Sequence, residues 1–266
     1  MVDKHTFSVK FESFRPQLKS YILRVTASVE DTEDIVQEAF LKGYNKLDSF
    51  KGESSLKTWV FAIAFNLAKD HLRSKKRWPE NVTDICREKA LNNKEFLQEM
   101  MGIRMTSEQG AFEIKEHITF CFACVSKSLP IEQQVTLLLK EIYGFKVKEI
   151  AEIIDNTEAM VKYYLHVSRH KMIDIFDHRC SLINKEGVCH QCTELNGIFN
   201  PKQKAQEEIL KIEMARESET KSKEELFDLR MEIVKGIDPY ESGAAKLQLR
   251  HLKHNKEVMD EYLKKK

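Results

Sequence analysis

Four polar side chains at close to helical spacing, in the segment that begins at Thr157, have the chemistry needed to contact duplex DNA. They are Lys162, Tyr163, His166 and Arg169. Lys and Arg bind phosphate oxygens, while Tyr and His form hydrogen bonds with base edges or with the DNA backbone. An ordinary helical hairpin with a solvated polar face is the alternative explanation of the same pattern.

The elements that must position these side chains are a short helix, a tight turn and a second helix. Apolar residues at helical spacing predict the first helix over 147–154. Asp155 and Asn156 break that helix, and Thr157 is a good N-cap for the next. The buried stripe predicted for the second helix consists of Val161, Leu165, Ser168 and Met172. This arrangement is typical of a helix-turn-helix that places its second helix in the major groove.

A second cluster combines aromatic and basic residues along a helix predicted over 56–75. Its aromatic residues include Trp59, Phe61 and Phe65. The helix and the residues after it carry Asn66, Lys69, His71, Arg73, Lys75, Lys76 and Arg77. Cations that hold phosphates beside aromatic faces that stack on bases suit single-stranded DNA, at about 1–3 kcal/mol per stacked base. For Phe61 and Phe65, burial in a helical core is the competing explanation.

The cysteines form a third candidate site. Cys189 and Cys192 make a CxxC pair, and such a knuckle commonly binds zinc, here with Cys180 or His178 as a third ligand. A redox role for these three thiols is the alternative. A second pair, Cys121 and Cys124, lies on a predicted helix, where buried cysteines often act as small apolar residues.

Composition favours a helical protein of about two domains, because 266 residues include only 9 glycines and 5 prolines. The net charge of +1 means that binding to nucleic acid must come from local basic clusters. The sequence has no signal-peptide pattern, and its longest mostly apolar run, Trp59–Ala68, is shorter than the roughly 20 residues of a membrane span. We therefore expect a cytoplasmic protein without membrane insertion, in which cysteines serve as thiols or metal ligands.

Two stretches together resemble the extracytoplasmic-function (group IV) sigma factors of bacterial RNA polymerase. Residues 31–41 and 50–73 resemble region 2 of that family, and 129–145 with the helix-turn-helix resemble region 4. The resemblance implies an all-α fold of two helical sigma domains and a linker, followed here by a helical extension. The predicted boundaries are 6–80 for region 2, 81–112 for the linker, 113–177 for region 4 and 178–266 for a Cys-containing extension with a regulatory role.

The resemblance also implies a role for individual residues. It assigns binding of core RNA polymerase to Asp31, Asp34, Gln37 and Glu38. It assigns the −10 element to Trp59, Asn66, Lys69, Arg73 and Arg77, with the 49–55 loop receiving an extruded base. It assigns the −35 element to Thr157, Lys162, Tyr163, His166 and Arg169. Tyr163 and its neighbour Tyr164 replace the Ser-Arg pair of many relatives, so the resemblance implies the activity but not the promoter sequence that is read.

The sequence thus predicts a sigma factor that directs promoter recognition, strand opening and transcription initiation, and that is not an enzyme. Its expected partners are core RNA polymerase and promoter DNA, with an anti-sigma factor as a further candidate. No cofactor is required; the suggested one is zinc, at Cys180, Cys189 and Cys192. A stand-alone helix-turn-helix regulator is the main alternative, and a thiol- or zinc-dependent enzyme is a weaker one.

The last third of the chain contains helical patterns over 222–235 and 244–266 with few apolar residues. These segments cannot form a core of their own, so we expect them to pack on the sigma domains or on a partner. A partly disordered tail is the alternative.

Overall fold

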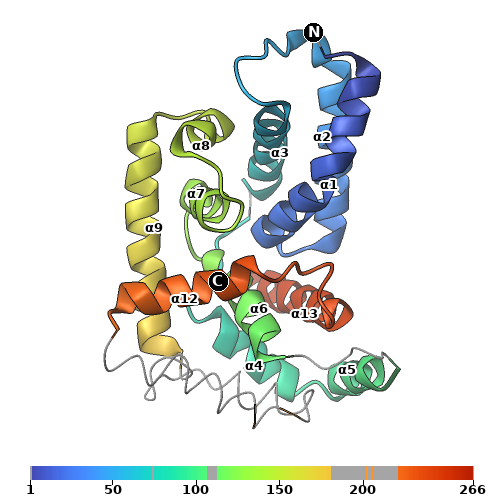
Figure 1. Cartoon of the computed structure of the whole chain (residues 1–266). Coiled ribbons are helices and arrows are strands. Elements are labelled where there is room, and N and C mark those ends of the chain that lie inside the picture. Colours follow the sequence, from blue (N-terminus) through green and yellow to red (C-terminus); the bar gives the residue numbers. More distant parts are fainter. Residues whose placement is uncertain are drawn as a thin grey trace. The chain divides into compact units, whose positions relative to one another are not determined.

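The computed structural model describes residues 2–73, 75–106, 113–180, 202, 205 and 221–265 (Figure 1). Within these ranges the elements are α-helices and one short 3-10 helix, without a β-strand, so the all-α prediction is confirmed. The helices are α1 (Lys4–Thr26), α2 (Val29–Asn45), η1 (Leu47–Ser49), α3 (Leu56–Leu72), α4 (Val82–Leu91), α5 (Lys94–Thr106), α6 (Ile114–Ser126), α7 (Ile131–Glu141), α8 (Val147–Ile154), α9 (Glu158–Arg179), α12 (Lys223–Lys235) and α13 (Ala245–Lys264).

The chain divides into two compact units. The first comprises Met1–Arg77 and Leu129–Ser168, and the second comprises Trp78–Ser128 and Arg169–Lys266. These units cut across the predicted boundaries, because α6 packs with the extension while α7 and α8 pack with α1 and α3. None of the helices in the described ranges is both long and apolar enough to cross a bilayer.

Aromatic rings form the core of the first unit, where α1, α2 and α3 lie side by side (Figure 1). Phe7, Phe11 and Phe14 follow one another at one-turn spacing along α1, and all three are buried. The ring of Phe40 on α2 lies 5.0 Å from that of Phe11. Apolar periodicity on α1 and α2 therefore translates directly into the packing of the two helices.

Gly43, in the last turn of α2, leaves room for the Phe7 ring of α1. A Cβ atom placed on Gly43 would lie 2.8 Å from that ring, which is closer than such atoms approach one another. A side chain at this position would therefore force the Phe7 ring to shift.

Helix α3 contributes its aromatic residues to the same core. Ser55 caps it by accepting a hydrogen bond from the Thr58 amide at 3.0 Å. Phe61 has 0% of its surface exposed and Phe65 has 1%. The core explanation of these two rings is therefore correct, and they are not available for stacking on bases.

The helix-turn-helix forms as its sequence predicts. Asp155 ends α8 in the left-handed conformation (φ 51°), and its amide donates to the Ala151 carbonyl. Thr157 caps α9 by accepting from the Met160 amide at 3.2 Å. Within the predicted stripe of α9, Val161, Ser168 and Met172 are buried and Leu165 is half-buried.

The second unit is built around α6, against which α12 and α13 both pack. The predicted linker contains two helices, α4 and α5, which α13 also contacts. The expectation that the C-terminal helices pack on other parts of the chain is therefore confirmed for α12 and α13. The sequence also predicts a helix over 204–216, and of that stretch the structure describes only residue 205.

Three buried histidines lie at the contact of α13 with α5 and α6. The rings of His254 and Phe96 stack at 4.0 Å, and the ring of His251 lies 5.6 Å from that of Phe120 on α6. Burial lowers the pKa of His117 to about 4, with the charge of Arg230 acting in the same direction. Burial also lowers the pKa of His251 to about 3, and lowers the pKa of His254.

These pKa values predict acid-sensitive folding of the second unit. His117 and His251 are neutral in the folded protein, whereas in the unfolded chain they bind protons below about pH 6.5. The free energy of unfolding is therefore highest above about pH 6.5 and falls as the pH is lowered toward 4. From about pH 7.5 to about pH 5, each should cost about 2 kcal/mol of unfolding free energy. Denaturation followed by circular dichroism at both pH values measures this loss. His251→Leu should reduce it, whereas the exposed His5→Gln should leave it unchanged; equal losses in all three proteins would contradict the prediction.

Candidate nucleic-acid and polymerase interfaces

The first turns of α9 present the residues predicted to contact duplex DNA. Thr157, Lys162, Tyr163 and His166 are all exposed; Thr157 precedes the helix, and the other three lie on one side of its N-terminal half. Exposed amides and a hydroxyl at a helix N-terminus favour a phosphate, and Lys162 adds a positive charge. Arg169, about one turn after His166, is half-buried and donates to Asp228 of α12 at 2.7 Å.

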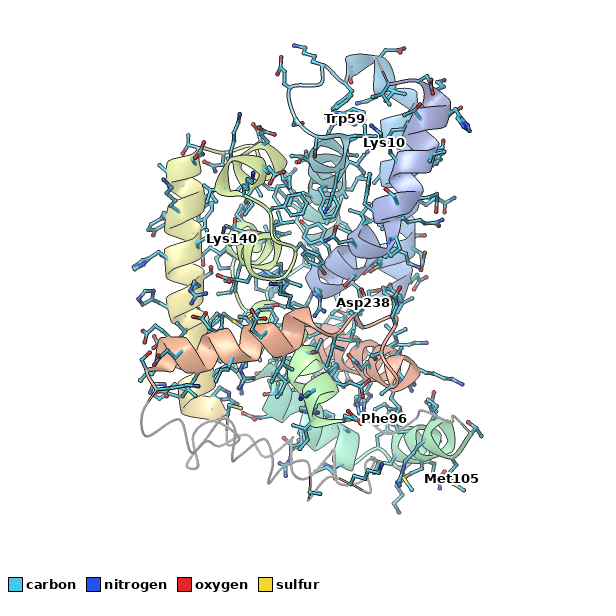
Figure 2. The ribbon with its side chains drawn as sticks, in the orientation of Figure 1. Lys10, Trp59, Phe96, Met105, Lys140 and Asp238 are labelled. Atoms are coloured by element: carbon cyan, nitrogen blue, oxygen red, sulfur yellow. The ribbon has the colours of Figure 1, made fainter. Side chains whose placement is uncertain are left out.

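The predicted −10 residues lie along α3 and immediately after it. Asn66, Lys69 and Arg73 are exposed, whereas Trp59 and Arg77 are half-buried. Figure 2 labels Trp59 on the N-terminal part of α3, and its ring lies 5.3 Å from that of Phe50, which precedes the helix. The loop between them contains Gly52 at φ 76°.

Two of the predicted −10 cations already have partners on α7. Lys69 Nζ lies 2.9 Å from the Glu132 carboxylate. Arg77 donates to the side-chain oxygen of Gln134, whose amide group donates in turn to the Arg24 carbonyl at 3.1 Å. Burial lowers the pKa of Arg77 to about 10, against the opposing effect of Glu132, so Arg77 remains a cation at neutral pH. DNA phosphates would have to displace these polar partners.

The predicted polymerase-binding residues on α2 differ in accessibility. Asp34, Gln37 and Glu38 are exposed and form a continuous polar surface on successive turns. Asp31 has an exposed side-chain fraction of only 15%; its carboxylate lies 3.0 Å from His71 Nε2 and forms an ion pair with Lys75 at 3.4 Å. The first three are thus more accessible to a partner than Asp31.

The cysteine site is described only in part. Cys180 is buried, and its sulfur accepts a hydrogen bond from Arg230 at 3.0 Å, while Cys189 and Cys192 lie outside the described residues. Cys180, Cys121 and His117 line one small cavity of about 20 Å³. Within the described ranges, no group of three or more His, Cys, Asp or Glu side chains is arranged to hold a metal ion.

Cys124, one turn after Cys121 on α6, behaves as a core residue. Cys124 is fully buried, and its sulfur accepts a hydrogen bond from the Asn255 amide at 3.5 Å. Burial raises the pKa of the Cys124 thiol to about 12. Such a thiol is a poor nucleophile and a poor metal ligand.

Comparison with known proteins identifies the family. The family model Sigma-70 region 2 matches residues 11–78, and the model Sigma-70, region 4 matches residues 120–172. The ECF RNA polymerase sigma-E factor of Haemophilus influenzae is 31% identical over 153 residues, which cover 58% of this chain and 78% of that protein. The chain belongs to the extracytoplasmic-function (ECF) family of RNA polymerase sigma factors. The predicted resemblance is confirmed.

A second relative of this ECF sigma factor has the same family name. The ECF RNA polymerase sigma-E factor of Escherichia coli K12 is 30% identical over 153 residues, covering 58% of this chain and 77% of that protein. The solved structure of the sigma factor RpoE in complex with the anti-sigma factor NepR from Bartonella quintana covers 64% of this chain and 96% of that one, with 18% identity and a TM-score of 0.43. The part of this sigma factor beyond residue 172 lies outside both family models.

Sequence reasoning missed the partners that this sigma factor supplies to its own predicted DNA-binding cations. Glu132, Gln134 and Asp228 each contact one such cation. Each of the three is a polar residue far in the sequence from the cation that it contacts. The spacing of residues within one helix therefore does not predict these pairings. Only their position on helices that pack near α3 or α9 identifies them.

The two aromatic positions of α3 should separate folding from strand opening. Phe61→Ala should lower the free energy of unfolding by about 3–5 kcal/mol, because it leaves a cavity in the core. Trp59→Ala should leave most of the stability but reduce promoter opening, measured by the chemical reactivity of unpaired thymines. A strongly destabilised Trp59→Ala protein, or one that opens promoters normally, would contradict this assignment.

The exposed face of α9 should bind duplex DNA largely through charge. Lys162→Ala should weaken binding to a duplex selected from a random pool and reduce the salt dependence by about one counterion, because one phosphate contact is lost. Lys140→Ala on α7 is the matched control, since Lys140 is also exposed and is labelled in Figure 2. Equal salt slopes for the two variants would count against a phosphate contact at Lys162. Fluorescence anisotropy at several salt concentrations measures both slopes.

Proposed function

We propose that this ECF sigma factor divides initiation among three polar surfaces. The exposed surface of α2 binds core RNA polymerase, α3 and the loop before it capture the opened −10 element, and the start of α9 binds the −35 duplex. The protein catalyses no reaction itself and acts in the cytoplasm, where the polymerase and the chromosome are found. The observation that carries this proposal is the exposure of Lys162, Tyr163 and His166 at the N-terminal end of a capped helix in a helix-turn-helix.

The chemistry of α9 supports reading of a duplex. The helix-turn-helix packs through α8 and the apolar stripe of α9, which leaves the opposite side of α9 for DNA. Tyr163 can donate to a phosphate or pack against a thymine methyl group, and His166 can hydrogen-bond to a base edge. Lys162 supplies the charge that draws this face to the backbone.

The chemistry of α3 supports capture of a single strand. Trp59, half-buried beside Phe50, has an aromatic face near a glycine-containing loop. Asn66, Lys69 and Arg73 continue along the exposed side of α3 as hydrogen-bonding and cationic groups. An aromatic platform followed by cations is the arrangement that binds unpaired bases and their phosphates.

Reconstituted transcription tests the proposal. Purified protein added to core RNA polymerase should produce transcripts from a library of promoter fragments, and each reaction needs both components. Asp34→Lys should lower the affinity for core polymerase by about 3–10-fold, because it reverses a charge in the proposed interface. Glu12→Lys reverses the charge of another exposed residue, on α1, and should have little effect. A protein that binds duplex DNA but never supports initiation would instead be a stand-alone regulator.

A zinc site at Cys180, Cys189 and Cys192 is a separate proposal. Its support is the CxxC spacing and the position of Cys180 immediately after α9. Elemental analysis of the purified protein should find about one zinc per chain, and Cys189→Ser should remove most of it. The matched control is Cys86→Ser, which replaces a buried thiol on α4. Metal-free wild-type protein, or unchanged zinc in Cys189→Ser, would remove the proposal.

A further inference from the structure

The C-terminal half of α9 is bound by α12 of the extension. Arg169 donates to Asp228 at 2.7 Å, and its guanidinium carbon lies 5.1 Å from the centre of the Phe227 ring. About two turns further along α9, Asp177 lies 2.6 Å from Lys223 Nζ. Charged contacts therefore connect the two helices at separate points.

Apolar burial holds α12 in this position. Phe227 and Leu226 of α12 are buried together with Ile173 and Phe176 of α9, and the four side chains line the same small cavity. Arg230, also buried, places its guanidinium 3.8 Å from the centre of the Phe176 ring. The contact between Arg169 and Asp228 thus lies at the edge of a packed interface. The packing of the two helices keeps the two side chains close to each other.

The group bound to Arg169 is a chemical competitor of DNA. A guanidinium binds carboxylate and phosphate oxygens with the same donors and the same planar geometry, so it cannot fully satisfy both. We propose that α12 is an intramolecular competitor of promoter DNA. Asp228 binds the Arg169 guanidinium, and this ion pair must break before Arg169 can bind a DNA phosphate or base. This inference rests on the proposed function, because it assumes that Arg169 contacts the −35 duplex.

The competition is limited to one end of the DNA-binding face. Lys162 and His166 are exposed, whereas the Arg169 side chain has an exposed fraction of only 26%. The extension therefore tunes the affinity for duplex DNA and does not abolish it. Because the Asp228 side chain is 59% exposed, its pairing with Arg169 is weak. Its removal should raise the affinity for DNA about three- to fivefold.

Binding of the full-length protein to a fluorescent duplex, selected by that protein from a random pool, tests the competition. Asp228→Ala should bind about three- to fivefold more tightly than the wild type. Glu232→Ala is the matched control, since it removes the same charge from an exposed position on the same helix. Arg169→Ala and the double variant Arg169→Ala/Asp228→Ala complete a thermodynamic cycle. Circular dichroism verifies that all four variants keep the helical content of the wild type.

The outcomes separate the inference from the proposed function. Tighter binding by Asp228→Ala alone, absent from Glu232→Ala and from the double variant, supports the competition. If Asp228→Ala binds like Glu232→Ala while Arg169→Ala weakens binding, Arg169 contacts DNA but α12 does not compete, and the inference is wrong. If Arg169→Ala has no effect even without Asp228, Arg169 is not a DNA contact, and the inference again fails. Transcription with core polymerase would survive both negative results, so the proposed function is judged by its own experiment.

Discussion

Burial of Phe61 is the interaction on which the first unit depends. Its ring lies 5.3 Å from that of Tyr21 on α1 and 5.0 Å from that of Phe145, in the connection between α7 and α8. One side chain therefore fills space shared by three segments that are far apart in the sequence. Because α3 cannot rotate without exposing this ring, its polar residues Asn66 and Lys69 face outward in a defined direction. A hydrophobic contact thus fixes the orientation of a polar surface.

The second unit is held together differently from the first, because α12 and α13 contain few apolar residues. Buried polar contacts supplement their packing on α6. The Ala244 amide donates to the Glu116 carboxylate at 2.8 Å, and Asn255 bridges α13 to Cys124. Such groups are costly to bury unless they are paired, so they specify one arrangement of the helices. Helices α12 and α13 are therefore folded against α6 and share a core with it.

Local features of this fold were predictable from the sequence. The cap at Thr157, the turn at Asp155 and the exposure of Lys162 all follow from spacing within one or two turns of helix. The role of Phe61 was not predictable, because an aromatic ring on a mostly apolar helix suits both a core and a stacking platform. The structure decides for the core, since neighbouring rings surround Phe61.

Ion pairs between residues far apart in the chain could not be predicted from the sequence, for a physical reason. Asp31 looks like a free docking residue in a helical wheel, yet it lies between His71 and Lys75 at the end of α3. Lys69 and Glu132 are likewise paired only because α7 packs near α3. A charge in a sequence states what a residue can bind, whereas the fold decides which oppositely charged group is nearest. Candidate binding residues could therefore be named, but their internal competitors could not.

Gly43 shows how an absent side chain can constrain the packing of a core. Since the Phe7 ring fills the space beside its Cα, even a methyl group there would force that ring to move. The polar surface formed by Asp34, Gln37 and Glu38 lies earlier on the same helix and does not contact that ring through position 43. The residue types of that surface can therefore change independently, whereas any side chain at position 43 would disturb the aromatic core.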